Sequence, residues 1–532
     1  MKYKSLLVIF LMLVFSCSSD SEEPNNPQPN PDPPTQGDPD TTAPTITIGG
    51  LESEVEILTT LTVTIADASN TVNTVILVND TEVFSTTDKT ISYELDPFDF
   101  PSGATTLTIQ STDDSDNLGT ESETFELKKL LFRSTDLAGF DPSNETVDIY
   151  VAINLKESGE LITSRLMQTY DDATFYAPEE FKREQIVVTR YVLGKGAIFN
   201  LNVGESFASL EPGIEIMTVE EAVAKLNLNR GPLTREGKFN LTISDVPVNT
   251  DVNANSSDYV LNGSASSGEV FYNPQNTESV LIYSVPSFTD VDLDSYKYFI
   301  INQFEDTSLS LNDFETVSVE NRITNNLPPE TLNYSFQLHG YTNMERYTKD
   351  NNHELYNAVG GENYLNKNAN DYSFPTISDF SVLRQRFYID LDDGRKVFAS
   401  VRGLSGFEVP DLSIDRAGDL ITINGTYDTH TLIQDIEGPI PDGNSDSILF
   451  RRFYIDDNSN TVPIPFDALE IPKEIILDLT EKGFLINSTN NTGKLSIDLI
   501  KREQEVQYQD RIFYFLQRNE AGDTYSVTFP LD

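Results

Sequence analysis

The chain of 532 residues has no tryptophan, one cysteine and three histidines, and only 36 lysines and arginines against 85 aspartates and glutamates. A single cysteine excludes both a disulfide framework and a thiolate zinc site. The formal net charge of −49 argues against nucleic-acid binding, because neutralising phosphates requires clustered Lys and Arg side chains. Since 38% of the residues are hydrophobic and 10% aromatic, the chain still has enough apolar side chains for folded domains.

Long apolar runs are also missing, with one exception near the N-terminus. The run from Leu6 to Phe15 follows two lysines and is too short to cross a bilayer as a helix. It has the length and the flanks of a signal peptide. We therefore predict a signal peptide over residues 1–16 and an exported protein.

The only cysteine, Cys17, directly follows Val14-Phe15-Ser16. This segment resembles a bacterial lipoprotein signal, in which the cysteine becomes the acylated first residue of the mature protein. The next residues, SSDSEE at 18–23, resemble the acidic tag of surface-exposed lipoproteins in Bacteroidota. The resemblance implies lipidation of Cys17 and a place in the outer membrane, facing the extracellular side. The alternative is an ordinary secretory signal followed by a chance cysteine.

Composition and patterning divide the rest of the chain into four parts. Residues 17–43 are rich in acid and proline, which favours an extended tether. Residues 44–129 alternate apolar and polar side chains between turn signals, as in a β-sandwich, and resemble bacterial Ig-like modules, which implies a spacer or adhesion role. We expect a β-rich middle region over 130–325 with one helix at 218–228, and a C-terminal β-rich domain over 326–532. The predicted fold is thus mainly β and multidomain.

No residue pattern points to catalysis. There is no nucleophile elbow, P-loop or dinucleotide fingerprint, and His353-Glu354 lacks the second histidine of a zinc-protease helix. We therefore predict a protein that is not an enzyme and has no cofactor. If a metal binds, calcium is the more plausible one, as a structural Ca²⁺, because oxygen ligands are abundant. Three clusters are rich in such ligands: Asp113/Asp114/Asp116/Asn117, Asp290/Asp292/Asp294 and Asp456/Asn458/Asn460.

A five-residue repeat marks the best candidate surface. Arg-Phe-Tyr-Ile-Asp occurs at 386–390 and again at 452–456, each time before a polar turn, which predicts two similar hairpins. On a strand, Arg and Tyr share one face, while Phe and Ile share the other. We predict a binding face at Arg386, Tyr388, Arg452 and Tyr454. The simpler alternative is the solvent face of an ordinary half-buried strand.

Together these features predict a non-catalytic, surface-exposed outer-membrane lipoprotein. It would act as a binding or scaffold subunit, with another outer-membrane or surface protein as its partner. A glycan-binding lipoprotein of a polysaccharide-uptake system is the first alternative, although glycan sites often use tryptophan and this chain has none. An extracellular hydrolase is the second alternative.

Overall fold

The structure is a computed structural model. It describes residues 40–68, 70–134, 147–167, 173–194, 202–216, 237–248, 250–256, 259–261, 267–272, 274, 277–286, 293–348, 352–361, 371–404, 408–439, 445–455, 459–484, 486, 493–502 and 523–531. The signal peptide, Cys17, most of the tether and the helix predicted over 218–228 lie outside the described residues.

Residues 45–127 form two sheets. Their strands are β1 (Thr45–Gly49), β2 (Glu54–Val55), β3 (Thr59–Ala66), β4 (Thr71–Val78), β5 (Thr81–Thr86), β6 (Thr90–Leu95), β7 (Gly103–Asp113) and β8 (Leu118–Leu127), with a 3-10 turn η1 (Pro97–Asp99). The strand orders are β1-β3-β6 and β2-β8-β7-β4-β5. In β3 every second residue is buried, as the alternation predicted. The β4–β5 turn falls at Asn79 and Asp80, whose φ angles of 49° and 63° suit the twist of a tight hairpin.

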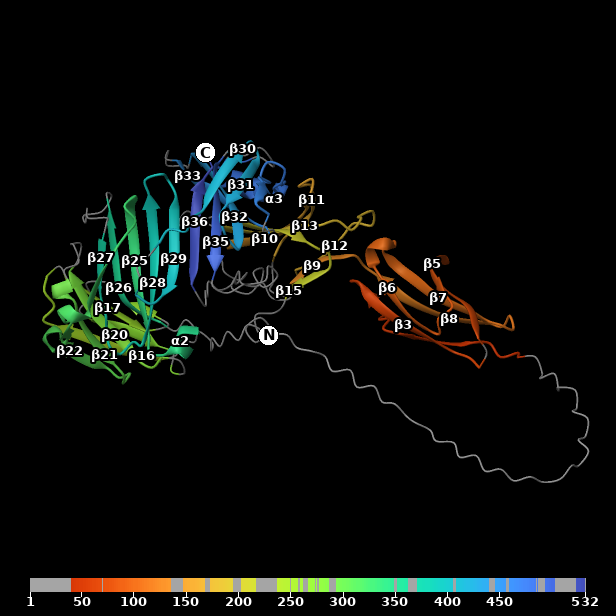
Figure 1. Ribbon diagram of the computed structural model, residues 1–532, viewed down its shortest axis with the longest axis horizontal. Coiled ribbons are helices and arrows are strands. Elements are labelled where there is room, and N and C mark those ends of the chain that lie inside the picture. The colour runs from red at the N-terminus through yellow and green to blue at the C-terminus, as the bar shows by residue number, and fades with distance from the viewer. Residues whose placement is uncertain are drawn as a thin grey trace, which may run out of the picture. The chain divides into compact units, whose positions relative to one another are not determined.

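A twelve-stranded sheet forms the largest element (Figure 1). Its order is β11-β10-β13-β14-β33-β32-β35-β36-β29-β28-β25-β26. The first four of these strands are β10 (Val147–Leu155), β11 (Leu161–Leu166), β13 (Ile186–Gly194) and β14 (Val203–Leu210). The other eight are β25 (Thr331–Tyr341), β26 (His353–Gly361), β28 (Val382–Leu391), β29 (Lys396–Arg402), β32 (Thr429–Pro439), β33 (Ser445–Tyr454), β35 (Lys494–Arg502) and β36 (Thr524–Pro530).

Three small sheets accompany this large sheet. The sheet β12-β9-β15 consists of β9 (Leu130–Ser134), β12 (Ala173–Tyr176) and β15 (Ile214–Ile216). The sheet β30-β31-β34 consists of β30 (Ser413–Ala417), β31 (Leu420–Asn424) and β34 (Thr461–Pro463), and β24 (Arg322–Asn326) pairs with β27 (Asp371–Pro375). The described residues contain two α-helices, α2 (Met344–Thr348) and α3 (Lys473–Glu481). No helix in this part of the chain is both long and apolar enough to span a membrane.

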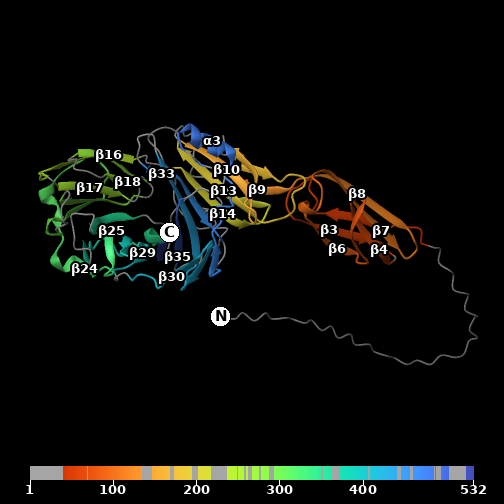
Figure 2. The same ribbon diagram turned by 90° about the horizontal axis from the view of Figure 1, so that it is seen from above.

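The large sheet joins strands from the predicted middle region to strands from the predicted C-terminal domain. β14 pairs with β33 in parallel, which can be followed in Figure 2, so the sheet crosses the boundary predicted at residue 325. Between these parts, residues 237–316 form two sheets of their own, β19-β16-β22 and β18-β17-β20-β21-β23. Their strands are β16 (Gly237–Ser244), β17 (Thr250–Ser256), β18 (Tyr259–Leu261), β19 (Ser267–Tyr272), β20 (Val280–Pro286), β21 (Lys297–Ile301), β22 (Thr307–Ser310) and β23 (Glu315–Thr316), with 3-10 turns η2 (Leu293–Ser295) and η3 (Leu311–Asp313), while η4 (Val319–Asn321) follows. The protein is therefore mainly β and multidomain, as predicted.

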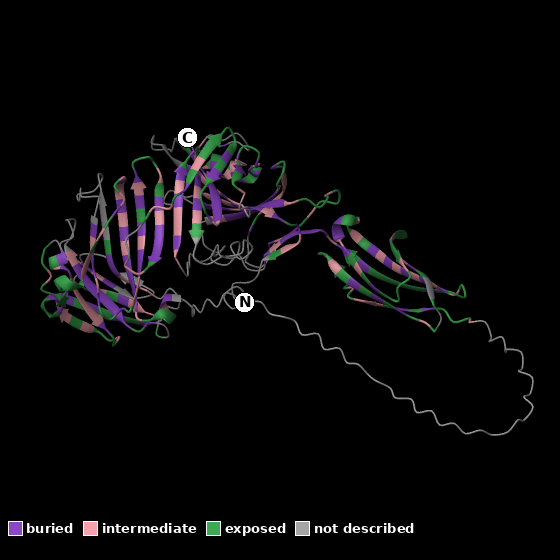
Figure 3. Cartoon of the chain, viewed as in Figure 1, coloured by how far each residue is buried: buried purple, intermediate pink, exposed green. Residues whose placement is uncertain are grey.

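The main core lies on one face of the twelve-stranded sheet. Phe387, Ile389, Val397 and Ala399 point into it from β28 and β29. On the other face of these two strands, Arg386, Tyr388 and Phe398 are partly exposed, whereas Arg384 and Ser400 are buried. Figure 3 shows the alternation of buried and partly exposed residues along the strands. The β28–β29 hairpin turns at Asp392-Asp393-Gly394, as predicted, and Gly394 has a φ of 87° that side chains disfavour.

A fully buried arginine fixes the chain that follows β33. The guanidinium of Arg451 donates to Gln434 Oε1 (3.2 Å), to the Phe466 carbonyl (3.3 Å) and to the Leu469 carbonyl (3.2 Å). Its Cζ also lies 5.1 Å from the ring centre of Phe466. Arg451 thereby holds the segment around Phe466 and Leu469 against the sheet.

Arg451→Ala should lower the free energy of unfolding by about 3 kcal/mol or more, because three oxygen atoms lose their donors and a cavity opens. The neighbouring Arg452→Ala should cost less than about 1 kcal/mol, since that side chain is 33% exposed. Urea unfolding followed by tyrosine fluorescence measures both changes, because the chain has no tryptophan. Equal losses in the two variants would contradict the role given to Arg451.

Candidate functional site

The two copies of the repeat lie on the same face of the twelve-stranded sheet. From β28 to β36, the register pairs Tyr388 with Phe398 and Phe398 with Ser526. Pro530, four residues after Ser526 on β36, pairs with Ser496 on β35. Ser496 in turn pairs with Ile433 on β32, and Ile433 pairs with Arg452 on β33. Residues an even number of positions apart on one strand point to the same face of the sheet, and so do directly paired residues on neighbouring strands. Tyr388 on β28 and Arg452 on β33 therefore lie on the same face. The copies are five strands apart, which at roughly 4.8 Å per strand is roughly 24 Å. They do not form one compact site.

The first copy remains open to solvent. Tyr388 is 49% exposed, and its ring centre lies 4.9 Å from that of Phe398 on the neighbouring strand. Arg386, two residues away, is half-buried. Burial raises the pKa of the nearby Glu354 carboxyl, against a hydrogen bond from Tyr283 and the positive charge of Arg386. The sheet therefore presents an aromatic and a cationic side chain side by side at this position.

The second copy is used inside the sheet. Tyr454 stacks on Phe207 of β14 with ring centres 5.0 Å apart and an angle of 5° between the planes. The guanidinium of Arg452 lies 3.7 Å from the carboxylate of Glu205, which is on β14 like Phe207. The predicted second hairpin is wrong, because β33 pairs with β14 and β32, while the next strand, β34, pairs with β31. The neighbouring strand thus decides the role of each copy.

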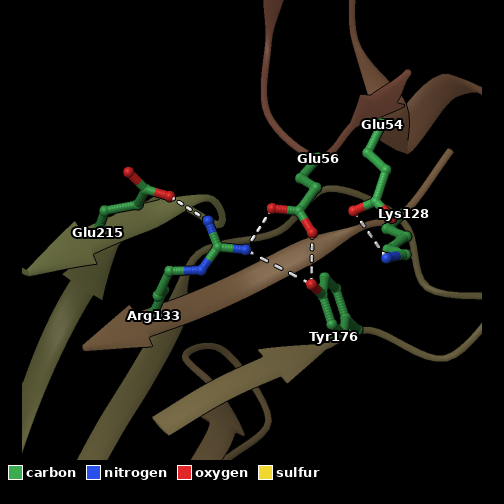
Figure 4. Close-up of polar contacts among 6 residues, drawn as sticks. All are labelled: Glu54, Glu56, Lys128, Arg133, Tyr176 and Glu215. Atoms are coloured by element: carbon green, nitrogen blue, oxygen red, sulfur yellow. Dashed lines mark hydrogen bonds and ion pairs between the residues drawn. The ribbon is translucent and has the colours of Figure 1, made fainter. Parts of the chain in front are cut away.

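A charged network surrounds the connection between β8 and β9, and we call its six residues the charged junction (Figure 4): Glu54, Glu56, Lys128, Arg133, Tyr176 and Glu215. Glu56 lies at its centre and accepts hydrogen bonds from the Tyr176 hydroxyl and from the Arg133 guanidinium. Arg133 also donates to Glu215 Oε1 at 2.5 Å, and Lys128 donates to Glu54 Oε2 at 2.9 Å. The network therefore links β9, β12 and β15 to the segment around β2.

The pKa values of the charged junction follow from this arrangement. Burial alone would raise the pKa of Glu56, but the hydrogen bonds from Tyr176 and Arg133 outweigh it, and the pKa lies below its usual value. Burial opposes the charge of Arg133 as well, and contact with Glu56 still raises its pKa. Burial and the hydrogen bond to Glu56 raise the pKa of Tyr176. The neighbours thus stabilise the charged forms of Glu56 and Arg133 and the neutral form of Tyr176.

Sequence reasoning missed the charged junction, although one signal was present. Arg133 is the first arginine in the chain, and Lys89 is the only basic residue between Lys4 and Lys128. The first cations after such a long acidic stretch are candidate partners for some of those acids, and Arg133 is among them. Which acid it meets depends on the fold, because Glu56 and Arg133 are 77 positions apart.

One group of carboxylates in the described residues could hold a metal ion. Asp40, Asp67 and Asp113 each place an oxygen within 4.8 Å of the others. The structure thus joins Asp113 of the first predicted Ca²⁺ cluster to two distant aspartates rather than to Asp114 or Asp116. Three carboxylates supply part of the roughly six to eight oxygens that Ca²⁺ takes. Parts of the other two predicted clusters lie outside the described residues, at 290–292 and 456–458.

Asp113 already has a local structural role in the β7–β8 turn. Its Oδ1 accepts the backbone N–H groups of Ser115 and Asn117, each at 2.8 Å, and its Oδ2 accepts from Asn117 Nδ2 at 2.9 Å. The side chain is buried. These bonds explain the turn whether or not a cation binds there.

A serine and a histidine lie in contact in the described part of the chain. Ser279 Oγ lies 3.2 Å from His353 Nε2. The same Nε2 lies 2.9 Å from the Ser279 carbonyl oxygen, so it has to donate a proton to that oxygen. A nitrogen that carries this proton cannot act as a base toward the serine hydroxyl.

Asp113→Ala should lower the stability of the β7–β8 region by about 1–3 kcal/mol, because two backbone N–H groups lose a buried acceptor. The matched control is Asp114→Ala in the same exposed turn, where the side chain accepts from Asn70 Nδ2 at 3.4 Å, and for which we expect a much smaller loss. Urea unfolding in EDTA, and again with added Ca²⁺, measures both variants. A Ca²⁺-dependent gain in wild type that Asp113→Ala abolishes would reveal a bound cation, whereas equal losses in the two variants would contradict the role of Asp113.

No family model and no curated protein matches the chain. Similarities to solved structures are slight. They include the Bacillus anthracis TIE protein (7% identity over 68% of this chain and 70% of that chain, TM-score 0.15) and a Ca²⁺-stabilized adhesin with which an Antarctic bacterium binds ice (9%, 69% and 99%, TM-score 0.15). A third is Bacteroides ovatus SGBP-B in complex with a mixed-linkage heptasaccharide (10%, 64% and 93%, TM-score 0.15). At these scores the similarity carries no argument about this chain.

Proposed function

We propose that the chain is a non-catalytic, surface-exposed outer-membrane lipoprotein that binds a partner through the sheet face around Tyr388. Lipidated Cys17 would anchor it, and the partner would be another outer-membrane or surface protein. The observation that supports this proposal is the half-exposed Tyr388 beside Arg386 and Phe398, on strands whose opposite face is core. Tyrosine and arginine are enriched among the residues that dominate protein–protein binding.

The rigidity of this position favours binding. Phe387 and Ile389 are buried on either side of Tyr388 along β28, and they fix the backbone from which it projects. Aromatic side chains have few rotatable bonds, so little conformational entropy is lost when a partner covers them. By contrast, Tyr454 is stacked on Phe207, and Arg452 lies near Glu205, so the second copy contributes less accessible surface.

A glycan ligand is the second candidate, because polar groups flank the exposed ring. Asn333 Nδ2 donates to Asp390 Oδ2 at 3.4 Å, and this pair lies on the same face as Tyr388, two residues along β28. An aromatic ring with neighbouring amide and carboxylate groups can stack on a sugar and bind its hydroxyls. This arrangement would allow the face to bind a glycan although the chain has no tryptophan.

Tyr388→Ala should weaken partner binding by roughly thirtyfold or more, as expected for a central aromatic anchor. The matched control is Leu477→Ala on α3, which removes a side chain that is 63% exposed elsewhere. Pull-down after mild detergent extraction, followed by mass spectrometry, measures the partner, and a glycan array tests the second candidate. If both variants retain the partner equally, the proposed binding face is wrong. If Tyr388→Ala alone loses binding to a glycan, the ligand of this face is a glycan and not a protein.

Cys17→Ser should move the protein from the membrane fraction to the soluble fraction, because acyl chains on Cys17 would supply the anchor. Protease treatment of intact cells should digest the wild-type protein if it faces the outside. A Cys17→Ser protein that stays as firmly membrane-bound as wild type would show that the lipid anchor is wrong. Wild-type protein that resists digestion until the cells are lysed would contradict surface exposure.

A further inference from the structure

The connection between β8 and β9 is held along its backbone on both sides. Lys128 N–H donates to the Val55 carbonyl at 3.0 Å, and Leu130 N–H donates to the Glu56 carbonyl at 3.2 Å. On the other side, Ala177 N–H donates to the Lys129 carbonyl at 2.8 Å. Residues 128–130 are therefore paired like a strand between two segments, although connections between sheets are usually free to bend.

The side chains of the connection are held as well. Lys129 is buried, and its ammonium group donates to the carbonyls of Glu179 (2.8 Å) and Phe181 (3.3 Å). Lys128 pairs with Glu54 and lies 5.7 Å from the ring centre of Tyr176. A second ion pair, between Arg183 and Asp96 at 2.5 Å, joins the same two regions of the chain.

The charged junction stands next to these backbone bonds. Glu56, whose carbonyl accepts from Leu130, also supplies the carboxylate that Arg133 and Tyr176 contact. Its side chain is 16% exposed and that of Arg133 is 26% exposed. Such a pair is less screened by water than a surface ion pair and less costly to desolvate than a fully buried one. Losing either charge therefore weakens the hold on the connection.

We propose that the charged junction is an electrostatic latch, which keeps residues 128–130 inserted between the segment around Val55 and Glu56 and the end of β12. With the latch closed, the connection is not a hinge. Neutralising Glu56 or Arg133 opens it, because the remaining backbone pairs and the contacts of Lys128, Lys129 and Arg183 hold the connection less firmly. This inference does not depend on the proposed binding function.

The latch should respond to acid in a defined direction. Glu56 is faced by two cations, which are Arg133 on β9 and Lys128 in the connection, and by the neutral Tyr176 on β12. Two other acids pair with these cations: Glu215 with Arg133 and Glu54 with Lys128. The pKa of Glu56 lies below the usual value of 4.5. A depressed pKa means that its stabilising contribution is complete above 4.5 and is lost as the pH falls through the lowered value. The latch should thus be closed at neutral pH and open in acid.

Trypsin tests the latch at pH 8, because it cuts after lysine and arginine and needs an extended, accessible backbone. Wild type should resist cleavage after Lys128 and Lys129, while Glu56→Gln and Arg133→Met should be cut there about tenfold faster. The charge swap Glu56→Arg with Arg133→Glu should restore at least part of the resistance. The control is Lys238→Met, which breaks an exposed ion pair with Glu269 elsewhere. Mass spectrometry of the fragments identifies each cut.

Cleavage of Glu56→Gln and Arg133→Met no faster than that of the control would overturn the latch. Early cuts after Lys396 and Lys494, in the twelve-stranded sheet, would mean general unfolding and would equally count against a local latch. Hydrogen exchange on uncut wild type gives an independent measurement. Protection of the Lys128 and Leu130 amides should fall when the pH is lowered from 6 to 3, while the amide of Ala399 in β29 stays protected. Unchanged protection at Lys128 and Leu130 would overturn the acid response.

Discussion

The parallel pairing of β14 with β33 is the contact on which the largest sheet depends. It is the one place where strands from residues 147–210 meet strands from residues 331–530 in that sheet. Asn202 fixes the start of the pairing, because its Nδ2 donates to the Ile448 carbonyl at 2.8 Å and its carbonyl accepts from Phe450 N–H at 2.9 Å. Further along, Tyr454 stacks on Phe207. We call this pairing and its side-chain contacts the join. Without the join, the twelve-stranded sheet would divide into two separate sheets.

The join explains why two nearly identical sequence segments have different roles. In the second copy, Arg452 and Tyr454 face β14 residues that engage them, and they become part of the join. In the first copy, the residue opposite Tyr388 on β25 is Ser335, which is too small to cover an aromatic ring. Tyr388 therefore remains exposed. The exposure of each copy is decided by the neighbouring strand and not by the repeated residues.

Local features of the fold could be predicted from the sequence, and long-range ones could not. Alternation identified the buried faces of β3 and β28, and turn residues located the Asn79-Asp80 hairpin, because both signals act over a few positions. Neither the β14–β33 pair nor the Glu56–Arg133 contact has a local signature. For the candidate site, the outward direction of Tyr388 was predictable from its strand. The burial of Arg451 was not, because it depends on how the chain 15 and 18 positions further on folds back to place the carbonyls of Phe466 and Leu469.

The insertion of residues 237–316 has a consequence for how the protein folds. Asn202 and its partner Ile448 are 246 positions apart, so β14 has to wait for most of the chain before β33 can pair with it. During that time one edge of β14 presents unpaired N–H and C=O groups, which invite pairing with the wrong strand. Assembly that depends on such distant contacts is slow, because the loop must close before the contacts are gained. The inserted residues, which form their own core, can fold within that interval.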